Sequence, residues 1–183
     1  MTIYEIDPIR DERWDELLQN HPGASIFHTR GWLDALHRTY GYQPVAFTSS
    51  SPGEPLTNAI PFCRISSWLS GHRLVSLPFS DHCTPLMESS DQLIHLLRYL
   101  QGKLTSEKWS YIEVRPPDVG VADGTAFDKS KTFFLHKLDL HPELDDIHKN
   151  FHKDCVQRKI QRAAREGLVY EEGGSESLLT KFY

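Results

Sequence analysis

The sequence predicts an α/β fold in which helices flank a mixed sheet. Short runs rich in β-branched and aromatic residues alternate along the chain with segments whose apolar residues recur every three or four positions. Turn-forming residues keep most connections short, as in strands and helices that share one core. A chain of 183 residues is long enough for one well-buried domain, with about thirty residues to spare.

The strands are expected where extended patterns lie between turn signals. The Ser70-Gly71 turn should join two of them, 58–67 and 73–77, as an antiparallel pair. The complete set of expected strands is 3–6, 43–48, 58–67, 73–77, 109–115, 132–140 and 168–171, with a brief extended stretch at 25–28.

Three helices should cover this sheet. The first follows Asp7-Pro8, a typical helix start. The second begins at Thr29 and stops at Gly41, and the third has capping-box spacing at Ser89 and Gln92. Their apolar faces consist of Trp14, Leu17 and Leu18; of Trp32, Leu36 and Tyr40; and of Leu93, Leu96, Leu97, Leu100 and Leu104.

The last part of the chain indicates a second domain. We expect residues 1–147 to form the first domain, and residues 148–183 to hold a basic connecting helix and the start of another domain. A short helix capped by Ser175 carries four apolar residues that no later segment can cover: Leu178, Leu179, Phe182 and Tyr183. This pattern favours a chain that stops inside its second domain and cannot complete a reaction alone. The alternative is that these residues dock back onto the first domain.

Composition and charge argue against several classes of protein. A formal net charge of −5 disfavours a non-specific nucleic-acid binder, because phosphate neutralisation needs an excess of Lys and Arg. The N-terminus lacks the basic and apolar regions of a secretory signal, and no apolar run approaches the roughly 20 residues that span a bilayer. Three widely spaced cysteines fit reduced thiols. These observations predict a cytoplasmic protein.

Familiar catalytic motifs are absent from the sequence. It has no Gly-x-Ser-x-Gly elbow, Walker loop, His-Glu-x-x-His or Cys-x-x-Cys motif. The helically spaced pair His148 and His152 lies among Lys149 and Lys153, which would repel a cation, so no metal site is expected.

A proline-bracketed loop, 78–85, gives the first signal for a site. In it Asp81, His82 and Cys83 place an acid, a base and a thiol side by side, and an acid beside an imidazole can hold its tautomer and raise its basicity. Adjacent side chains usually point in different directions, however. Ser80, Asp81 and His82 are therefore candidates for ligand contact, and Asp81 and His82 are weaker candidates for catalysis. The alternative is a turn in which Ser80 and Asp81 bond to backbone amides.

The basic helix gives the second signal. Arg158, Arg162 and Arg165 fall on one face of it, opposite an apolar face, and this arrangement suits recognition of phosphate or carboxylate. The alternative is a solvated surface helix. Two further candidates for ligand contact are Trp32, which could instead belong to the core, and Arg115, which could simply pair with Glu113 on the same strand face.

In this order the segments resemble the FemAB-like proteins, relatives of the aminoacyltransferases that build peptidoglycan interpeptide bridges. The order and spacing of the matching residues cover nearly the whole chain. They are Phe27, Thr29, Trp32 and Leu33; Tyr40-Gly41-Tyr42; the run from Arg73 to Asp81; Glu113 and Arg115; and the helix from Arg158 to Gly167. The Leu-Pro-Phe-Ser-Asp part of the run is typical of the acetyltransferase-like subgroup.

The resemblance implies a GNAT-like acyl-CoA N-acyltransferase fold in two tandem domains, with a substrate cleft where they meet. This chain matches the first domain, the basic connecting helix and the opening of the second domain, which in the family forms most of the acyl-donor site. No cofactor is expected on this part of the protein, and the implied donor is acyl-CoA or aminoacyl-tRNA. The sequence has Asp34, Ala35 and Leu36 where the peptide-bridge enzymes carry lysines that hold a nucleotide-linked precursor. It also lacks the Arg/Gln-x-x-Gly-x-Gly/Ala pyrophosphate loop of coenzyme A enzymes.

The resemblance thus predicts transfer of an acyl or aminoacyl group to an amine of a cell-envelope or surface-polymer precursor. Attack of an amine on a thioester or ester needs orientation and electrostatic help more than a protein nucleophile. The alternative is a non-catalytic module that binds an anionic small molecule or nucleotide-linked precursor through Arg158, Arg162 and Arg165. A third possibility is contact of the same helix with tRNA.

Overall fold

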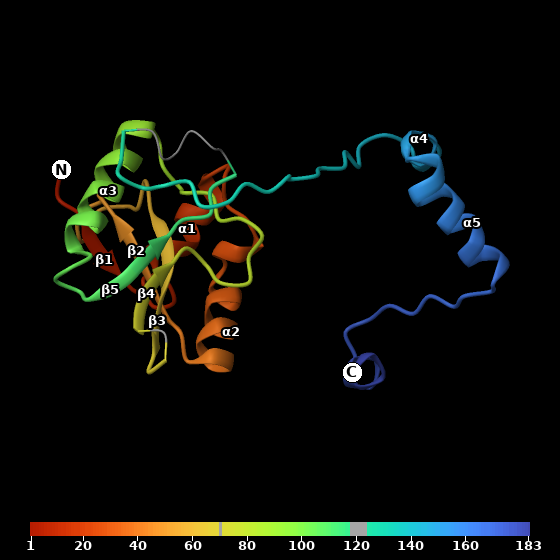
Figure 1. The fold of residues 1–183 in the computed structure, drawn as a ribbon, viewed down its shortest axis with the longest axis horizontal. Helices are drawn as coiled ribbons and strands as arrows, with labels where there is room; N and C mark the ends of the chain where they lie inside the picture. Colours follow the sequence, from red (N-terminus) through yellow and green to blue (C-terminus); the bar gives the residue numbers. More distant parts are fainter. Residues whose placement is uncertain (70, 118–123) are drawn as a thin grey trace. The chain divides into compact units, whose positions relative to one another are not determined.

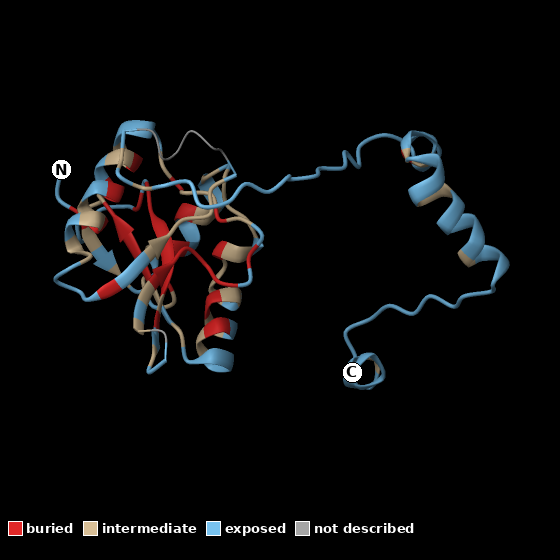
Figure 2. Cartoon of the chain, in the orientation of Figure 1, coloured by how far each residue is buried: buried red, intermediate tan, exposed pale blue. Residues whose placement is uncertain are grey.

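The computed structural model describes residues 1–69, 71–117 and 124–183. The chain divides into two units, Met1–Phe133 and Phe134–Tyr183. The first unit holds a sheet, helices and the core, whereas the second holds short helices joined by extended segments (Figure 1). Figure 2 shows that the buried positions concentrate in the first unit.

A five-stranded mixed sheet organises the first unit. Its strands are β1 (Tyr4–Ile6), β2 (Gln43–Thr48), β3 (Ile60–Ser67), β4 (Gly71–Val75) and β5 (Trp109–Glu113), in the spatial order β1-β2-β3-β4-β5. The first three pairings are antiparallel and the β4–β5 pairing is parallel. A parallel pair needs a crossover, which α3 (Ser90–Lys103) supplies. The predicted mixed α/β fold is confirmed.

Helix α3 covers one face of the sheet. Its leucines Leu93, Leu96, Leu97 and Leu100 pack on strand residues that include Phe47 and Phe62. The predicted leucine stripe is therefore the face of α3 that packs against the sheet. The capping prediction also holds, because the hydroxyl of Ser89 accepts a hydrogen bond from the backbone N–H of Gln92 at 3.3 Å.

Helices α1 (Arg13–Asn20) and α2 (Arg30–Tyr40) cover the other face. The predicted ends of α2 are confirmed: Thr29 accepts from the backbone N–H of Trp32, and Gly41 adopts φ 69°, the left-handed conformation that favours glycine. Helix α1 begins later than predicted, because Asp7 instead closes a turn by accepting the Ile9 N–H at 2.9 Å. The stretch expected to be extended before α2 is a 3₁₀ turn, η1 (Ile26–His28).

The second unit contains helices α4 (Leu144–Asn150), α5 (Arg158–Arg165) and α6 (Glu176–Phe182), with a π-helical turn, η3 (Lys153–Gln157), before α5. The strands predicted at 132–140 and 168–171 are wrong, because both segments are exposed and form no strand. Alternating apolar residues do not make a strand without a neighbouring strand to take up their hydrogen bonds. The predicted exposure of Leu179, Phe182 and Tyr183 is confirmed, while Leu178 is half-buried.

Candidate functional site

The loop after β4 leaves the sheet and returns to it beside β5. The backbone N–H of Ser76 bonds to Glu113 O at 2.8 Å, which extends the parallel pairing by one residue. The backbone N–H of Cys83 bonds to Arg115 O at 2.7 Å, which brings the loop back to the same strand. Between these two anchors, Leu77 and Phe79 adopt φ values of 54° and 61°. Left-handed backbone is unfavourable for such residues and is often found at functional sites.

Ser80 and Arg115 stabilise this loop from within. The Ser80 hydroxyl is buried and donates to Leu77 O at 2.6 Å. Arg115 donates from Nη1 to Ser80 O at 3.1 Å and from Nε to Glu113 at 2.7 Å. The predicted alternative for Arg115, pairing with Glu113, is therefore what the structure shows. Both side chains hold the loop in place, and the prediction that they contact a ligand stays a prediction.

The three consecutive residues after Ser80 point to three different environments. Asp81 is exposed, His82 is half-buried and Cys83 is buried. No hydrogen bond or ion pair joins Asp81 to His82 in the described ranges. The expectation that neighbouring side chains diverge is confirmed, and the acid, base and thiol do not form one cluster.

His82 and Trp32 are brought together by Phe27. The His82 ring meets the Phe27 ring edge-on with centroids 5.9 Å apart, and the Trp32 ring does so at 5.3 Å. Trp32 Nε1 and His82 Nδ1 are buried, and neither has a hydrogen-bond partner among residues 1–69, 71–117 and 124–183. Such atoms are rare in folded proteins, since an unpaired buried polar group costs about 1–3 kcal/mol.

His28 is an organising residue that the sequence interpretation did not single out. Its Nδ1 accepts the backbone N–H of Ser25 at 3.1 Å, so the ring proton is on Nε2, which donates to Thr84 O at 3.0 Å. Burial lowers the pKa of His28, which favours the neutral ring. A signal was present in the sequence, because His28 directly follows the Phe27 of the resemblance motif. A buried imidazole with fixed bonds is nevertheless not distinguishable by sequence alone.

Cys83 is not a nucleophile in this structure. Its Sγ lies 3.6 Å from His28 Nε2, and burial raises the pKa of the thiol to about 12. The thiol stays protonated at neutral pH, and only a thiolate attacks efficiently. Cys63, in the same buried cluster, has its pKa raised to about 12 for the same reason.

The three arginines of the basic helix lie in the second unit. Arg158 pairs with Asp154 at 3.0 Å and Arg162 pairs with Glu166 at 2.6 Å, both one turn apart on the helix. Both arginine side chains remain about three-quarters exposed, at 75% and 72%. Exposed pairs of this kind are weak, about 0–1 kcal/mol. Arg158, Arg162 and Arg165 therefore remain candidates for anion contact.

Within the described ranges, no group of three or more His, Cys, Asp or Glu side chains is placed to hold a metal ion. No described helix is long and apolar enough to cross a membrane.

No protein-family model matches the sequence, and no curated protein matches it. The structure is similar to a solved one titled a probable acetyltransferase, with 17% identity, a TM-score of 0.46, and coverage of 78% of this chain and 100% of the other. It is also similar to a ribosomal-protein-alanine N-acetyltransferase from Brucella melitensis biovar Abortus 2308, with 16% identity, a TM-score of 0.45, and coverage of 75% of this chain and 100% of the other. Both likenesses are weak. The chemistry of this chain therefore has to be inferred from its own side chains.

Proposed function

We propose that the loop after β4 is the acceptor side of an N-acyltransferase or aminoacyltransferase site. The observation that carries this proposal concerns two buried atoms, Trp32 Nε1 and His82 Nδ1, on the two rings that pack on Phe27. Neither atom has a hydrogen-bond partner in the part of the chain that the structure describes. A ligand that supplies partners to both atoms would recover the free energy lost by burying them, about 1–3 kcal/mol each.

The two atoms have complementary chemistry for acyl transfer. In this reaction a neutral amine nitrogen bonds to the carbonyl carbon, and the carbon–sulfur or carbon–oxygen bond to the leaving group breaks. The proton that the nitrogen loses passes to the departing sulfur or oxygen. Trp32 Nε1–H can only donate, which suits a carbonyl oxygen that gains negative charge. A neutral His82 can accept a proton at Nδ1, which suits the attacking amine. No step requires the Cys83 thiol, whose pKa is too high for attack.

Asp81 adds charge next to this pair. Its side chain belongs to an exposed residue of the same loop, so it can attract an acceptor that arrives as an ammonium ion. We assign the acceptor to an amine-bearing cell-envelope or surface-polymer precursor, nucleotide-linked or otherwise anionic, as the resemblance implies. The donor would be acyl-CoA or aminoacyl-tRNA, and no donor-binding residue is assigned.

Calorimetric titration of the chain with a nucleotide-sugar peptide, acyl-CoA and aminoacyl-tRNA tests this proposal. Trp32→Phe removes the N–H and keeps the ring, and we expect it to weaken binding of the nucleotide-sugar peptide about tenfold, as loss of one buried hydrogen bond does. Trp68→Phe is the matched control, because Trp68 is 96% exposed on the β3–β4 turn. Equal affinity of the wild type and Trp32→Phe would contradict the proposal.

The same titrations separate the alternative, an anion-binding module on α5. This alternative is supported by the exposure of Arg158 and Arg162, whose side chains remain about three-quarters exposed. Under that alternative, replacing Arg158, Arg162 and Arg165 by Gln abolishes binding of every anionic ligand, whereas Trp32→Phe leaves binding unchanged. Loss of aminoacyl-tRNA binding alone in the α5 variant would instead indicate contact with tRNA.

A further inference from the structure

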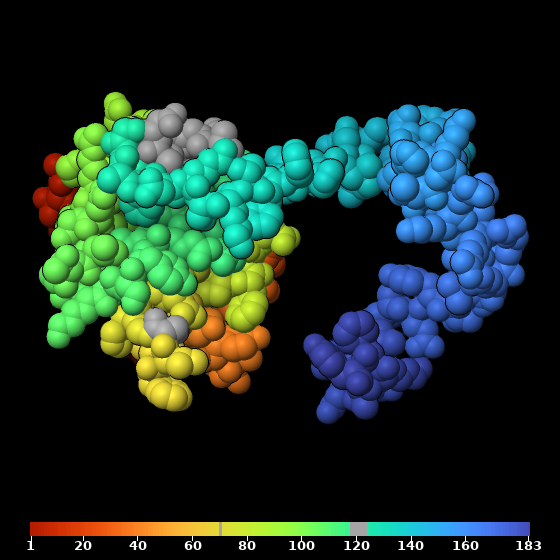
Figure 3. Space-filling view, viewed as in Figure 1, coloured from red at the N-terminus to blue at the C-terminus, as the bar shows by residue number. Residues whose placement is uncertain are grey.

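The turn between β3 and β4 exposes two large apolar side chains. Trp68 is 96% exposed and Leu69 is 81% exposed. They lie at the start of β4, whereas the loop of Ser80 follows its end, so they take no part in the site described above. In Figure 3 the yellow β3–β4 segment projects from the surface of the first unit. A tryptophan left almost wholly in water on such a tip indicates a partner that covers it.

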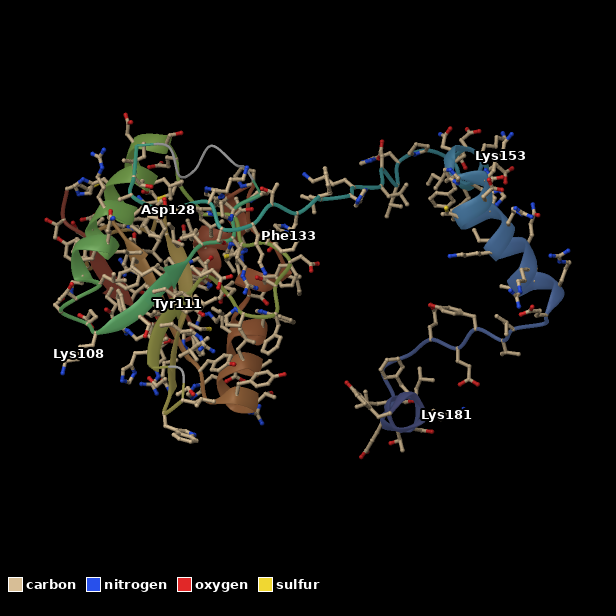
Figure 4. All side chains as sticks on the ribbon, viewed as in Figure 1. Lys108, Tyr111, Asp128, Phe133, Lys153 and Lys181 are labelled. Atoms are coloured by element: carbon tan, nitrogen blue, oxygen red, sulfur yellow. The ribbon has the colours of Figure 1, made fainter. Side chains whose placement is uncertain are left out.

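A basic cavity adjoins the base of the same hairpin. It has a volume of about 230 Å³ and is lined by both hairpin strands and by the start of β5. Its charged or titratable lining groups are Arg64, His72, Arg73, Glu107 and Lys108. Figure 4 shows Lys108 at the turn where β5 begins, with its side chain directed outwards.

Positive charge predominates around this cavity. Arg64 is neutralised by Glu5, to which it donates two hydrogen bonds of 2.7 and 2.6 Å. Glu107 is matched by Lys103, whose Nζ lies 3.5 Å from it. Arg73 and Lys108 are two further cationic side chains of the lining, which holds a single carboxylate, that of Glu107. An anionic group is therefore favoured beside the apolar tip.

We propose that the β3–β4 tip docks on an anionic membrane surface, with Trp68 and Leu69 entering the interface and the basic cavity facing lipid phosphates. Tryptophan is favoured at the boundary between headgroups and acyl chains. Lysine and arginine next to it gain from the negative surface potential. A protein partner fits less well, because two side chains on a narrow turn offer far less than the roughly 1,000 Å² that a stable interface buries. This inference is independent of acyl transfer.

Sedimentation of the full chain with lipid vesicles tests the docking. Vesicles that contain phosphatidylglycerol should bind the protein, and pure phosphatidylcholine vesicles should bind it at least tenfold more weakly. The double variant Trp68→Ser with Leu69→Ser should lower the partition onto anionic vesicles at least tenfold. Lys108→Asn should lower it about fivefold, the effect of one basic residue near such a surface. Asparagine tolerates the φ of 55° at this position, so the turn is kept.

The control is Ile26→Ser, which removes another apolar side chain that is 67% exposed in the first unit. Its vesicle binding should equal that of the wild type. The proposal is overturned if the double variant binds anionic vesicles as the wild type does, which would place any membrane contact elsewhere, for example on α5. It is also overturned if the chain binds neither vesicle type, which would leave the tip as a protein contact, or if it binds both equally.

Discussion

His28 Nε2 lies 3.0 Å from the carbonyl oxygen of Thr84, and this hydrogen bond joins the turn before α2 to the loop after β4. The two residues are 56 positions apart in the chain. Because Phe27 precedes His28, the bond also holds the Phe27 ring in the place where Trp32 and His82 meet it. The arrangement of the candidate site therefore depends on a buried side chain outside the pair Trp32 and His82.

Replacing His28 by Ala should destabilise the first unit by about 2–4 kcal/mol. The change removes the bond to Thr84, leaves the Ser25 N–H without its acceptor, and creates a cavity at a fully buried position. Urea unfolding followed by tryptophan fluorescence measures the loss. His136→Ala, at an exposed position, is the control and should stay within about 0.5 kcal/mol of the wild type. A similarly small effect for His28→Ala would show that these bonds contribute little.

The cost of His28→Ala should shrink as the pH falls. Burial lowers the pKa of His28 in the folded protein below its usual value, so below about pH 6.5 the unfolded chain takes up a proton that the folded chain refuses. The contribution of His28 is fully present above that pH, and it is lost as the pH falls towards the folded pKa, by at most about 1.4 kcal/mol per pH unit. Unfolding of both proteins at about pH 7.5 and about pH 5.5 measures the difference. A cost that is equal at the two pH values would mean that the ring takes up its proton as readily in the folded chain as in the unfolded one.

The sequence predicted best those features that depend on the residues of a single helix. Thr29 and Gly41 set the ends of α2 through local backbone chemistry, and the leucine stripe of α3 sets the face that packs. The strand predicted at 132–140 failed because its pattern says nothing about whether a neighbour is present to pair with it.

The candidate site was only partly predictable for a related reason. Trp32 and His82 were both named from the sequence, but their meeting on Phe27 depends on contacts between residues about fifty positions apart, which no local pattern encodes. The direction of the Cys83 side chain is likewise a property of packing. It lies against His28 because the Cys83 N–H bonds to Arg115 O and the next carbonyl, Thr84 O, accepts from His28 Nε2.

Thiol reactivity should distinguish the three cysteines. Cys155 is exposed, whereas burial raises the pKa of Cys63 and of Cys83 to about 12. In the native protein at about pH 8, Ellman's reagent should therefore modify Cys155 rapidly and the other two only as the fold opens. Cys155→Ser should abolish the rapid phase, and all three thiols should react in denaturant. Rapid modification of the native Cys155→Ser variant would show that Cys83 or Cys63 is accessible and ionised.

The left-handed backbone at Phe79 should be revealed by comparing two truncations. Phe79 has φ 61° and stacks on Tyr40 with ring centroids 4.7 Å apart, and both Phe79→Ala and Phe79→Gly lose this stack. Glycine adopts that φ without strain, so Phe79→Gly should be the more stable of the two by about 1 kcal/mol. At a residue with negative φ the alanine variant would be the more stable of the two, because glycine loses more conformational entropy on folding. Thermal unfolding of both variants measures the order, and a more stable alanine variant would argue that the loop relaxes out of this conformation.

The second unit should make the chain self-associate. Leu179, Phe182 and Tyr183 are 59%, 80% and 95% exposed, so the second unit by itself does not cover the apolar side of α6. Covering each large apolar group is worth about 1.5–3 kcal/mol, enough for three of them to hold two copies together weakly. We expect sedimentation velocity to show a mean mass that rises with concentration, and serine at these three positions to restore a constant mass. Thr180→Ser with Lys181→Arg, which alters only the polar side of α6, should associate as the wild type does. A concentration-independent mass for the wild-type chain would mean that α6 has found cover within its own chain.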